Sequence, residues 1–277
     1  MHRLPILMSR AGWLLAGVML GSCDIRLPVP HQPTQGMPPQ VKSPPAKPSQ
    51  DSNVFVWMVA DSYHTGMVFP YSWLVESGFV PPAGIGSPQC VTLSWGSQLA
   101  YSKQGVHNPW RFCRVFLSST PGVMELIPIN WNVPEVCPNQ RIWRKVVPRD
   151  RGPALAAFLN GCTVKDAAGR PKVLCESSWG RGVQLESRYR YFMPRICNVW
   201  TAQTIEALGG TVHPWQGLTA DGLIRQIEKP PNDFELIWPG YGPQPKSWPK
   251  AMLTPGVPAR RSTDAPRVGG ACARPRG

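Results

Sequence analysis

The chain has 277 residues, a formal net charge of +13 at pH 7 and a hydrophobic content of 42%. This length and apolar content suffice for one globular domain with its own core. The charge is uneven, since the tail from residue 243 carries +6 and the first 53 residues carry +3, which leaves +4 for the middle. Charge held in terminal segments does not indicate a nucleic-acid partner. It favours attraction to anionic lipid or cell-wall polymer.

Residues 1–23 are typical of a targeting segment. Arg3 and Arg10 supply a basic region, and residues 11–20 supply an apolar run that is too short for a confident membrane-spanning helix. Small residues stand directly before Cys23, and this pattern resembles a bacterial lipoprotein signal peptide. Cys23 is therefore predicted to be lipidated, for example with palmitate, and to anchor the protein to a membrane of the cell envelope, facing the periplasm. An ordinary signal peptide and a short membrane anchor are the alternatives.

Composition then divides the rest of the chain. Residues 24–53 contain eight prolines and few apolar residues, which predicts an extended linker that holds a domain away from the membrane. Residues 54–240 are predicted to form the domain. Residues 241–277 are basic and rich in Pro and Gly, and we expect them to be disordered.

Apolar runs in the domain predict both strands and helices. Strands are expected, from β-branched and aromatic runs, at residues 54–59, 66–69, 91–95, 114–117, 123–127, 142–147 and 234–238. Helices are expected at residues 71–76, 151–160 and 197–208. A last helix would be capped by Thr219, present Leu223, Ile224 and Ile227 inward and stop at residues 229–231. Strands come first and helices interleave later. This order favours an α+β fold with a small, mostly antiparallel sheet packed against helices.

Eight cysteines bear on compartment and chemistry. Apart from Cys23 and Cys197, they are free to pair outside the cytoplasm. The spacing favours a bond from Cys90 to Cys113 across a hairpin and one from Cys162 to Cys175 around a polar loop, among other pairings that stay open. None has the close spacing of a structural zinc site, and we expect neither a metal nor an organic cofactor.

Cys197 is the candidate nucleophile. It opens a helix-like run soon after Pro194, and free N–H groups at a helix start stabilise a thiolate and lower the thiol pKa. The backbone N–H groups of Cys197 and Asn198 would also bind the oxyanion of an acyl-transfer reaction. A buried cysteine or half of a disulfide is the alternative.

His64 is the candidate general base. It ends an apolar run in the sequence DSYHTG, residues 61–66. The polar group that orients it would follow the next strand, where Gln98 and the weaker Ser97 are candidates, and Asp61 is a further possibility. For a single histidine, the alternative is a core residue bonded to a backbone carbonyl.

Two aromatic residues are candidates for a substrate groove. Tyr191 lies shortly before Cys197 in a basic and aromatic run, residues 187–192, which favours a groove or a strand with one wet face over nucleic-acid stacking in an exported protein. Trp95 stands at the end of the strand that precedes Ser97.

The motifs His-Thr-Gly, Trp-Gly and CNVWTA, residues 197–202, resemble a bacterial family known as domain of unknown function 2459, over residues 54–227. The family's turn reads Gly-Trp-Gly-Asp, whereas this chain has Ser94, Trp95, Gly96 and Ser97 and lacks the acidic residue. If the Asp of the family orients the histidine, that role falls to another group here.

The order of an early His and a late Cys is similar to that in circularly permuted papain-like hydrolases related to the NlpC cell-wall peptidases. This resemblance implies a Cys–His amide or ester hydrolase, or an acyltransferase, acting on peptidoglycan peptides or lipid acyl groups. The rival hypothesis is a non-catalytic envelope lipoprotein that binds a wall component or a partner protein.

Overall fold

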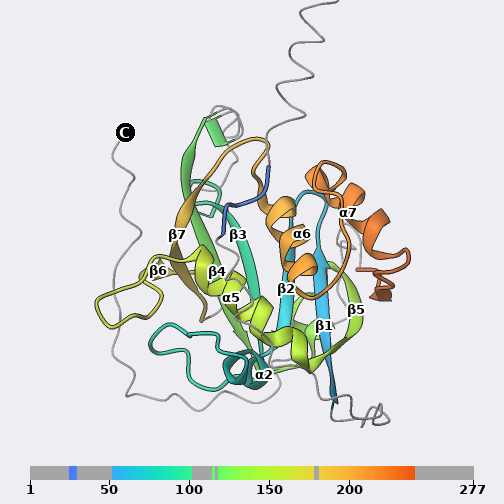
Figure 1. Cartoon of the computed structure of the whole chain (residues 1–277), viewed down its shortest axis with the longest axis horizontal. Helices are drawn as coiled ribbons and strands as arrows, with labels where there is room; N and C mark the ends of the chain where they lie inside the picture. The colour runs from blue at the N-terminus through green and yellow to red at the C-terminus, as the bar shows by residue number, and fades with distance from the viewer. Residues whose placement is uncertain (1–24, 30–51, 102–113, 116–117, 178–180, 241–277) are drawn as a thin grey trace, which may run out of the picture.

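The computed structural model describes residues 25–29, 52–101, 114–115, 118–177 and 181–240. Within these residues, eight strands form one open sheet in the order β6-β7-β4-β3-β2-β1-β5-β8, and every pair of neighbouring strands is antiparallel. Helices α2, α5 and α6 pack together over one face of the sheet (Figure 1). The α+β class with a mostly antiparallel sheet is therefore confirmed.

Six of the eight described strands overlap predicted runs, whereas β6 and β7 were not among the expected strands. The eight are β1 (Asn53–Ala60), β2 (Thr65–Pro70), β3 (Cys90–Ser97), β4 (Thr120–Ile129), β5 (Arg141–Pro148), β6 (Val173–Glu176), β7 (Val183–Tyr191) and β8 (Glu235–Trp238). The strand predicted at residues 114–117 is wrong, because Arg114 and Val115 are helical and the Arg114 carbonyl accepts from the backbone N–H of Ser118. A short apolar run has no periodicity that separates a strand from a helical turn. Residues 116–117 lie outside the described residues.

The helices are α2 (Tyr71–Glu76), α4 (Val133–Val136), α5 (Gly152–Cys162), α6 (Cys197–Ala207) and α7 (Ala220–Ile227), with short 3₁₀ turns η2 (Arg149–Arg151) and η3 (Gln216–Leu218). Helix α5 continues two residues beyond its predicted end at Asn160. The Asn160 amide does not cap the helix, since it bonds to the Val80 N–H and the Gly78 carbonyl. Among the described residues, no helix is long and apolar enough to span a membrane.

The core lies between the sheet and α6. Val56 and Met58 on β1 are fully buried in the large cluster on the helix side, whereas Val59 belongs to a smaller cluster on the opposite face. This division follows the alternation of side chains along a strand. Helix α6 is buried at every position from Cys197 to Ile205. A helix enclosed on all sides is held by the core, so its first residue has a fixed position.

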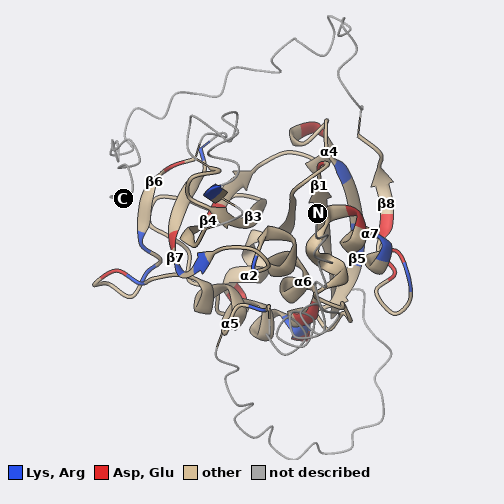
Figure 2. Ribbon diagram, turned by 90° about the horizontal axis from the view of Figure 1, so that it is seen from above, with Lys and Arg blue, Asp and Glu red and all other residues tan. Residues whose placement is uncertain are grey.

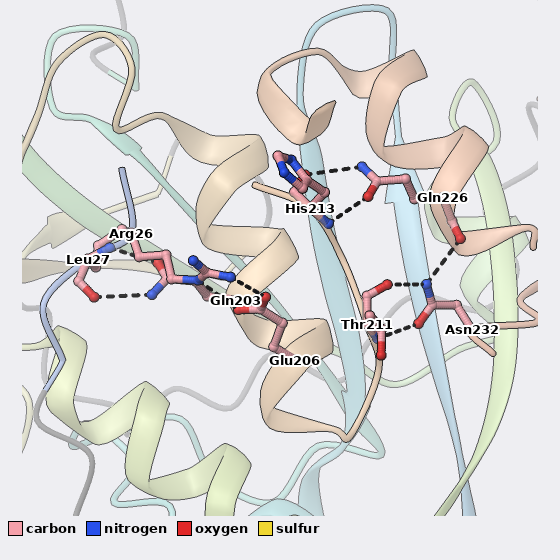
Figure 3. Close-up of polar contacts among 8 residues, drawn as sticks. All are labelled: Arg26, Leu27, Gln203, Glu206, Thr211, His213, Gln226 and Asn232. Carbon is pink, nitrogen blue, oxygen red and sulfur yellow. Dashed lines mark hydrogen bonds and ion pairs between the residues drawn. The ribbon is translucent and has the colours of Figure 1, made fainter. Parts of the chain in front are cut away.

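The linker predicted at residues 24–53 is wrong for residues 25–29. Residues 25–29 lie against the domain, with Ile25 and Leu27 almost completely buried. Figure 3 shows Leu27 beside Gln203 and Arg26 beside Glu206 on α6. Proline content concealed these two apolar residues, which are spaced to present one face of an extended segment. Cys23 and residues 30–51 lie outside the described residues.

The cysteine pairings favoured by the sequence are wrong. Cys90, Cys137, Cys162 and Cys197 are free, whereas Cys175 is disulfide-bonded, so none of those four is its partner. Cys162 is free and enclosed in the core at the end of α5. Spacing around a loop did not reveal that its side chain points into the core. Cys113 and Cys272 lie outside the described residues.

The segment between α6 and α7 is tied down by one amide. The Asn232 side chain accepts from the Thr211 N–H at 2.8 Å and donates to the carbonyls of Thr211 at 2.7 Å and Gln226 at 3.0 Å (Figure 3). The backbone N–H of the exposed His213 donates to Gln226 Oε1 at 2.6 Å. These bonds fix the stretch that carries η3 toward the start of α6.

Thr219 caps α7, since its hydroxyl accepts from the Gly222 N–H at 3.0 Å. We expect Thr219→Ala to lower the free energy of unfolding by about 1 kcal/mol, because the cap bond is lost. Thr219→Ser keeps an oxygen there and serves as the matched control. Chemical denaturation of both variants measures the effect, and equal losses for Ala and Ser would contradict the role of the cap.

Candidate functional site

Cys197 is the first residue of α6, as predicted. Ile196 before it is extended and provides no side-chain cap for the helix. The Cys197 thiol instead donates to Asn198 Oδ1 at 3.7 Å, and the backbone N–H of Asn198 and the Tyr191 hydroxyl lie near enough to lower the pKa of Cys197. Donors near a sulfur favour its thiolate form and therefore lower the pKa of the thiol.

Burial decides the protonation of this thiol. Cys197 is only 8% exposed. Desolvation raises the pKa of Cys197 to about 11, although the hydrogen bonds from Asn198, Tyr191 and Cys197 itself lower it, and the charge of Asp61 adds a further rise. The lowered pKa expected from the helix start is therefore wrong for this structure. The cost of burying a thiolate exceeds the stabilisation by the helix N-terminus.

His64 lies in a tight loop between β1 and β2. The Asp61 carboxylate accepts the backbone N–H groups of Tyr63 at 2.8 Å and His64 at 2.7 Å, and the Asp61 N–H donates to the His64 carbonyl at 3.0 Å. Burial lowers the pKa of His64, and the nearby charge of Asp61 raises it in part. The imidazole is thus neutral near pH 7, in the form that can accept a proton.

Asn198 joins the histidine loop to the cysteine helix. Its Oδ1 accepts from the Thr65 hydroxyl at 3.0 Å, and its Nδ2 donates to the carbonyls of Tyr63 at 3.4 Å and Leu218 at 3.2 Å. Tyr63 and Thr65 are the two neighbours of His64, and Asn198 is the neighbour of Cys197. The structure therefore brings together two motifs that lie more than 130 residues apart in the sequence.

The imidazole is held by Tyr101. The Tyr101 hydroxyl lies 3.0 Å from His64 Nε2 and 2.8 Å from the Ser94 hydroxyl, and the two rings meet edge to face at 81°. Burial and the charges of Glu125 and Cys197 raise the pKa of Tyr101 well above its ordinary value. Tyr101 thus contacts His64 directly and lies within electrostatic range of Cys197.

Sequence reasoning missed Tyr101, although Gly96 gave a signal for it. A Cβ at Gly96 would lie 2.3 Å from the Tyr101 ring, so the Trp-Gly turn contains a glycine where this ring crosses β3. The backbone of Tyr101 is held as well, since its carbonyl accepts from Gln184 at 3.1 Å and its N–H donates to Ser97 at 3.2 Å. A glycine inside a strand often marks such a close approach.

Ser97 and Gln98 do not take the predicted orienting role. Strand β3 continues to Ser97, so the Ser97 hydroxyl faces β4, where it pairs with Thr120 at 2.8 Å and accepts from the Leu99 N–H. Gln98 is half-buried and its backbone N–H donates to the Pro121 carbonyl. The prediction placed the end of the strand two residues too early. Asp61 acts on the loop backbone and on the imidazole through its charge.

The predicted groove residues are buried. Trp95 is 0% exposed, donates to the Ser187 hydroxyl at 2.8 Å and packs under Tyr191 with ring centroids 5.4 Å apart. Tyr191 is 4% and Asn198 is 2% exposed. These side chains therefore form the wall and floor around Cys197, and Trp95 does not line an open groove. A shallow pocket at Arg144, Lys145 and Asp233 shares no residue with this site.

Within the described ranges, no group of three or more His, Cys, Asp or Glu side chains could hold a metal ion. Comparison with protein-family models, curated proteins and solved structures finds no match to this chain. The resemblance to domain of unknown function 2459 therefore stays a prediction carried by the motifs.

The protonation of Cys197 can be tested by alkylation. We expect the rate at Cys197 to stay low at pH 7 to 8 and to rise as the pH approaches about 11, because only the thiolate reacts. Tyr191→Phe removes a donor that lowers this pKa, so the rise should move to higher pH. Peptide mapping after alkylation of the native, unreduced protein gives the rate at each thiol. A rate that levels off below pH 8 would contradict the effect of burial.

Proposed function

We propose that this protein is an envelope lipoprotein, anchored to the membrane through Cys23, with Cys–His amide or ester hydrolase or acyltransferase activity. The observation that supports it best is the pair of Asn198 bonds to the residues on either side of His64. The start of the buried helix that Cys197 opens is thereby bonded to the histidine loop, and the loop and Tyr101 keep the imidazole in place. This combination of nucleophile, base and orienting group is the pattern of covalent acyl transfer.

The opposite pKa shifts favour a neutral resting pair. Burial keeps Cys197 as a thiol and His64 as an uncharged imidazole. In the reaction, Cys197 Sγ would attack the acyl carbonyl while His64 takes its proton. The imidazolium would then give this proton to the leaving amine or alcohol as the bond to the acyl carbon breaks. Water or an acceptor amine would release the thioester, with His64 taking its proton and returning it to Sγ.

Tyr101 favours the tautomer that this reaction needs. When His64 Nε2 carries the proton and donates to the Tyr101 hydroxyl, Tyr101 donates in turn to Ser94, and Nδ1 is free to accept the thiol proton. The imidazolium formed in the reaction would keep its bond to Tyr101. If the Asp of the resembling family orients the histidine, a neutral tyrosine four residues beyond the matching Ser97 takes that role here.

The donors near Cys197 would supply the oxyanion site. The N–H groups of Cys197 and Asn198 and the hydroxyl of Tyr191 lie near enough to the sulfur to lower the pKa of Cys197. They would hold the oxygen of a tetrahedral intermediate formed on that sulfur. The raised pKa of Tyr191 keeps its hydroxyl protonated and therefore able to donate. Peptidoglycan peptides and lipid acyl groups both contain the carbonyl that this site would take.

The proposed arrangement is papain-like and circularly permuted. In this arrangement the histidine strand precedes the cysteine helix in the chain, and the helix packs on the sheet beside that strand. Helix α6 contacts β2, which begins directly after His64, and β3. The order of motifs and the resemblance to domain of unknown function 2459 agree with this arrangement.

The closed surroundings of Cys197 favour one rival function. A thiol that is 8% exposed and has its pKa raised to about 11 also suits a binding module that kept the fold without the reaction. Such a lipoprotein would bind a wall peptide or a partner protein through its surface. Cys197→Ala distinguishes the two functions, because it removes the turnover of an enzyme but leaves the ligand binding of a binding module intact.

Hydrolysis of a panel of acyl esters, thioesters and wall peptides tests the proposed activity. We expect Cys197→Ala to reduce turnover by at least about 10³-fold, because covalent catalysis is lost. Cys162→Ala is the matched control, since Cys162 is also free and buried but lies at the end of α5 and not at the start of α6, and it should retain turnover if it folds. Equal turnover by folded wild type and Cys197→Ala would contradict an enzyme. Binding without turnover would support the rival.

Tyr101→Phe tests the orienting group. Loss of the hydroxyl removes a hydrogen bond to the imidazolium, which is worth about 1.5–3 kcal/mol, so kcat should fall by roughly 10- to 100-fold. Because that bond favours the charged ring, the pKa of His64 should fall further and the acid limb of the pH–rate profile should move to lower pH. Tyr71→Phe is the control for a buried tyrosine elsewhere. A profile unchanged in both height and position would contradict the role of Tyr101.

A further inference from the structure

Residues 25–29 lie in a site on the domain that resembles a peptide-binding site. The Leu27 N–H donates to Gln203 Oε1 at 2.8 Å, and Gln203 Nε2 donates back to the Leu27 carbonyl at 3.1 Å (Figure 3). Ile25 is 3% and Leu27 is 2% exposed. One amide on α6 therefore pairs with both backbone groups of a residue whose side chain is buried in the core.

An ion pair holds Arg26, the residue between Ile25 and Leu27. Arg26 meets Glu206 in a two-pronged contact, with Nη2 to Oε1 at 2.8 Å and Nε to Oε2 at 3.2 Å. Both side chains are only partly exposed, at 37% and 27%. A bidentate pair in this setting fixes geometry better than a single contact between flexible surface charges.

The other end of the segment is fitted to α5 and β7. The Tyr189 hydroxyl donates to the Pro28 carbonyl at 2.9 Å. A Cβ at Gly161 would lie 2.5 Å from Val29 Cγ1, so α5 carries a glycine where Val29 packs. Three separate elements thus contribute to this one site, and the segment is an integral part of the fold.

We propose that residues 25–29 are a clamp that holds the domain directly against the membrane through the lipid on Cys23. This inference rests on the proposed lipoprotein. Cys23 precedes Ile25 by two residues, which span at most about 7 Å. The clamp therefore comes between the lipid and the proline-rich residues 30–51. Those residues join two parts of one domain and do not set its distance from the bilayer.

Charge beside the clamp suits a membrane surface. Arg188 and Arg190 are exposed on β7, on either side of the clamp residue Tyr189. Arg188 also lies within electrostatic range of Lys165. Figure 2 shows basic residues on β7, which also carries Glu186, whereas the charged residue of the neighbouring β6 is Glu176. Cations placed next to a lipid anchor are attracted to anionic headgroups, which favours the same orientation.

Neutron reflectometry of the lipidated full chain on a supported bilayer tests the clamp. For the wild type we expect the protein layer to begin within about 10 Å of the headgroups. The double variant Gln203→Ala, Glu206→Lys removes both the amide pairing and the ion pair. Its domain should then move outward by on the order of tens of Å, because the proline-rich residues become the tether. Glu235→Lys, an exposed charge change far from the segment, should leave the layer in place.

A wild-type layer that is already tens of Å away, or a double variant that does not move, would overturn the clamp. Mass measurement of the Cys23 peptide separates this from failure of the lipoprotein proposal, since an unacylated Cys23 removes the anchor itself. Hydrogen exchange of the full exported chain with Cys23→Ala measures the protection of the clamp residues in the absence of a membrane. The Leu27 N–H should be protected in that chain and should exchange at least about tenfold faster with Gln203→Ala. No protection in the unaltered clamp would also overturn the proposal.

Discussion

The buried amide of Asn198 is the interaction on which the rest of the candidate site depends. It accepts from Thr65 and donates to the carbonyls of Tyr63 and Leu218, so a single side chain joins the histidine loop, the start of α6 and the stretch before α7. At 2% exposure, none of these bonds can be replaced easily by water. The position of His64 relative to Cys197 is thus fixed by a polar contact within the core.

Burial gives this site its precision and also sets its resting state. The enclosed helix α6 fixes Cys197, but the same enclosure raises the pKa of the thiol and lowers that of His64. A neutral pair has little nucleophilic strength until a base removes the proton. The site therefore fits general-base chemistry, in which Tyr101 and Ser94 orient the ring, better than a preformed thiolate.

Much of the fold could be predicted because it depends on local patterns. The β-branched and aromatic run of β1 and the Thr219 cap of α7 are local, and the structure confirms both. Tyr101 was missed since its role depends on a ring crossing β3 at Gly96, a contact that no spacing in the sequence encodes. Residues 25–29 were assigned to a linker because proline content outweighed two apolar residues whose partners lie about 176 positions away. The thiol pKa was misjudged for a related reason, since burial is a property of the whole fold.

Capture of an acyl-enzyme tests the central claim most directly. The protein would be mixed with an activated acyl ester, quenched in acid and mapped by mass spectrometry. We expect a mass increase of one acyl group on the peptide that contains Cys197, and its loss in a folded His64→Ala variant, because the base that frees the thiolate is gone. An acyl group found instead on Cys90, Cys137 or Cys162, or an adduct on Cys197 that forms as fast without His64, would contradict a Cys–His site.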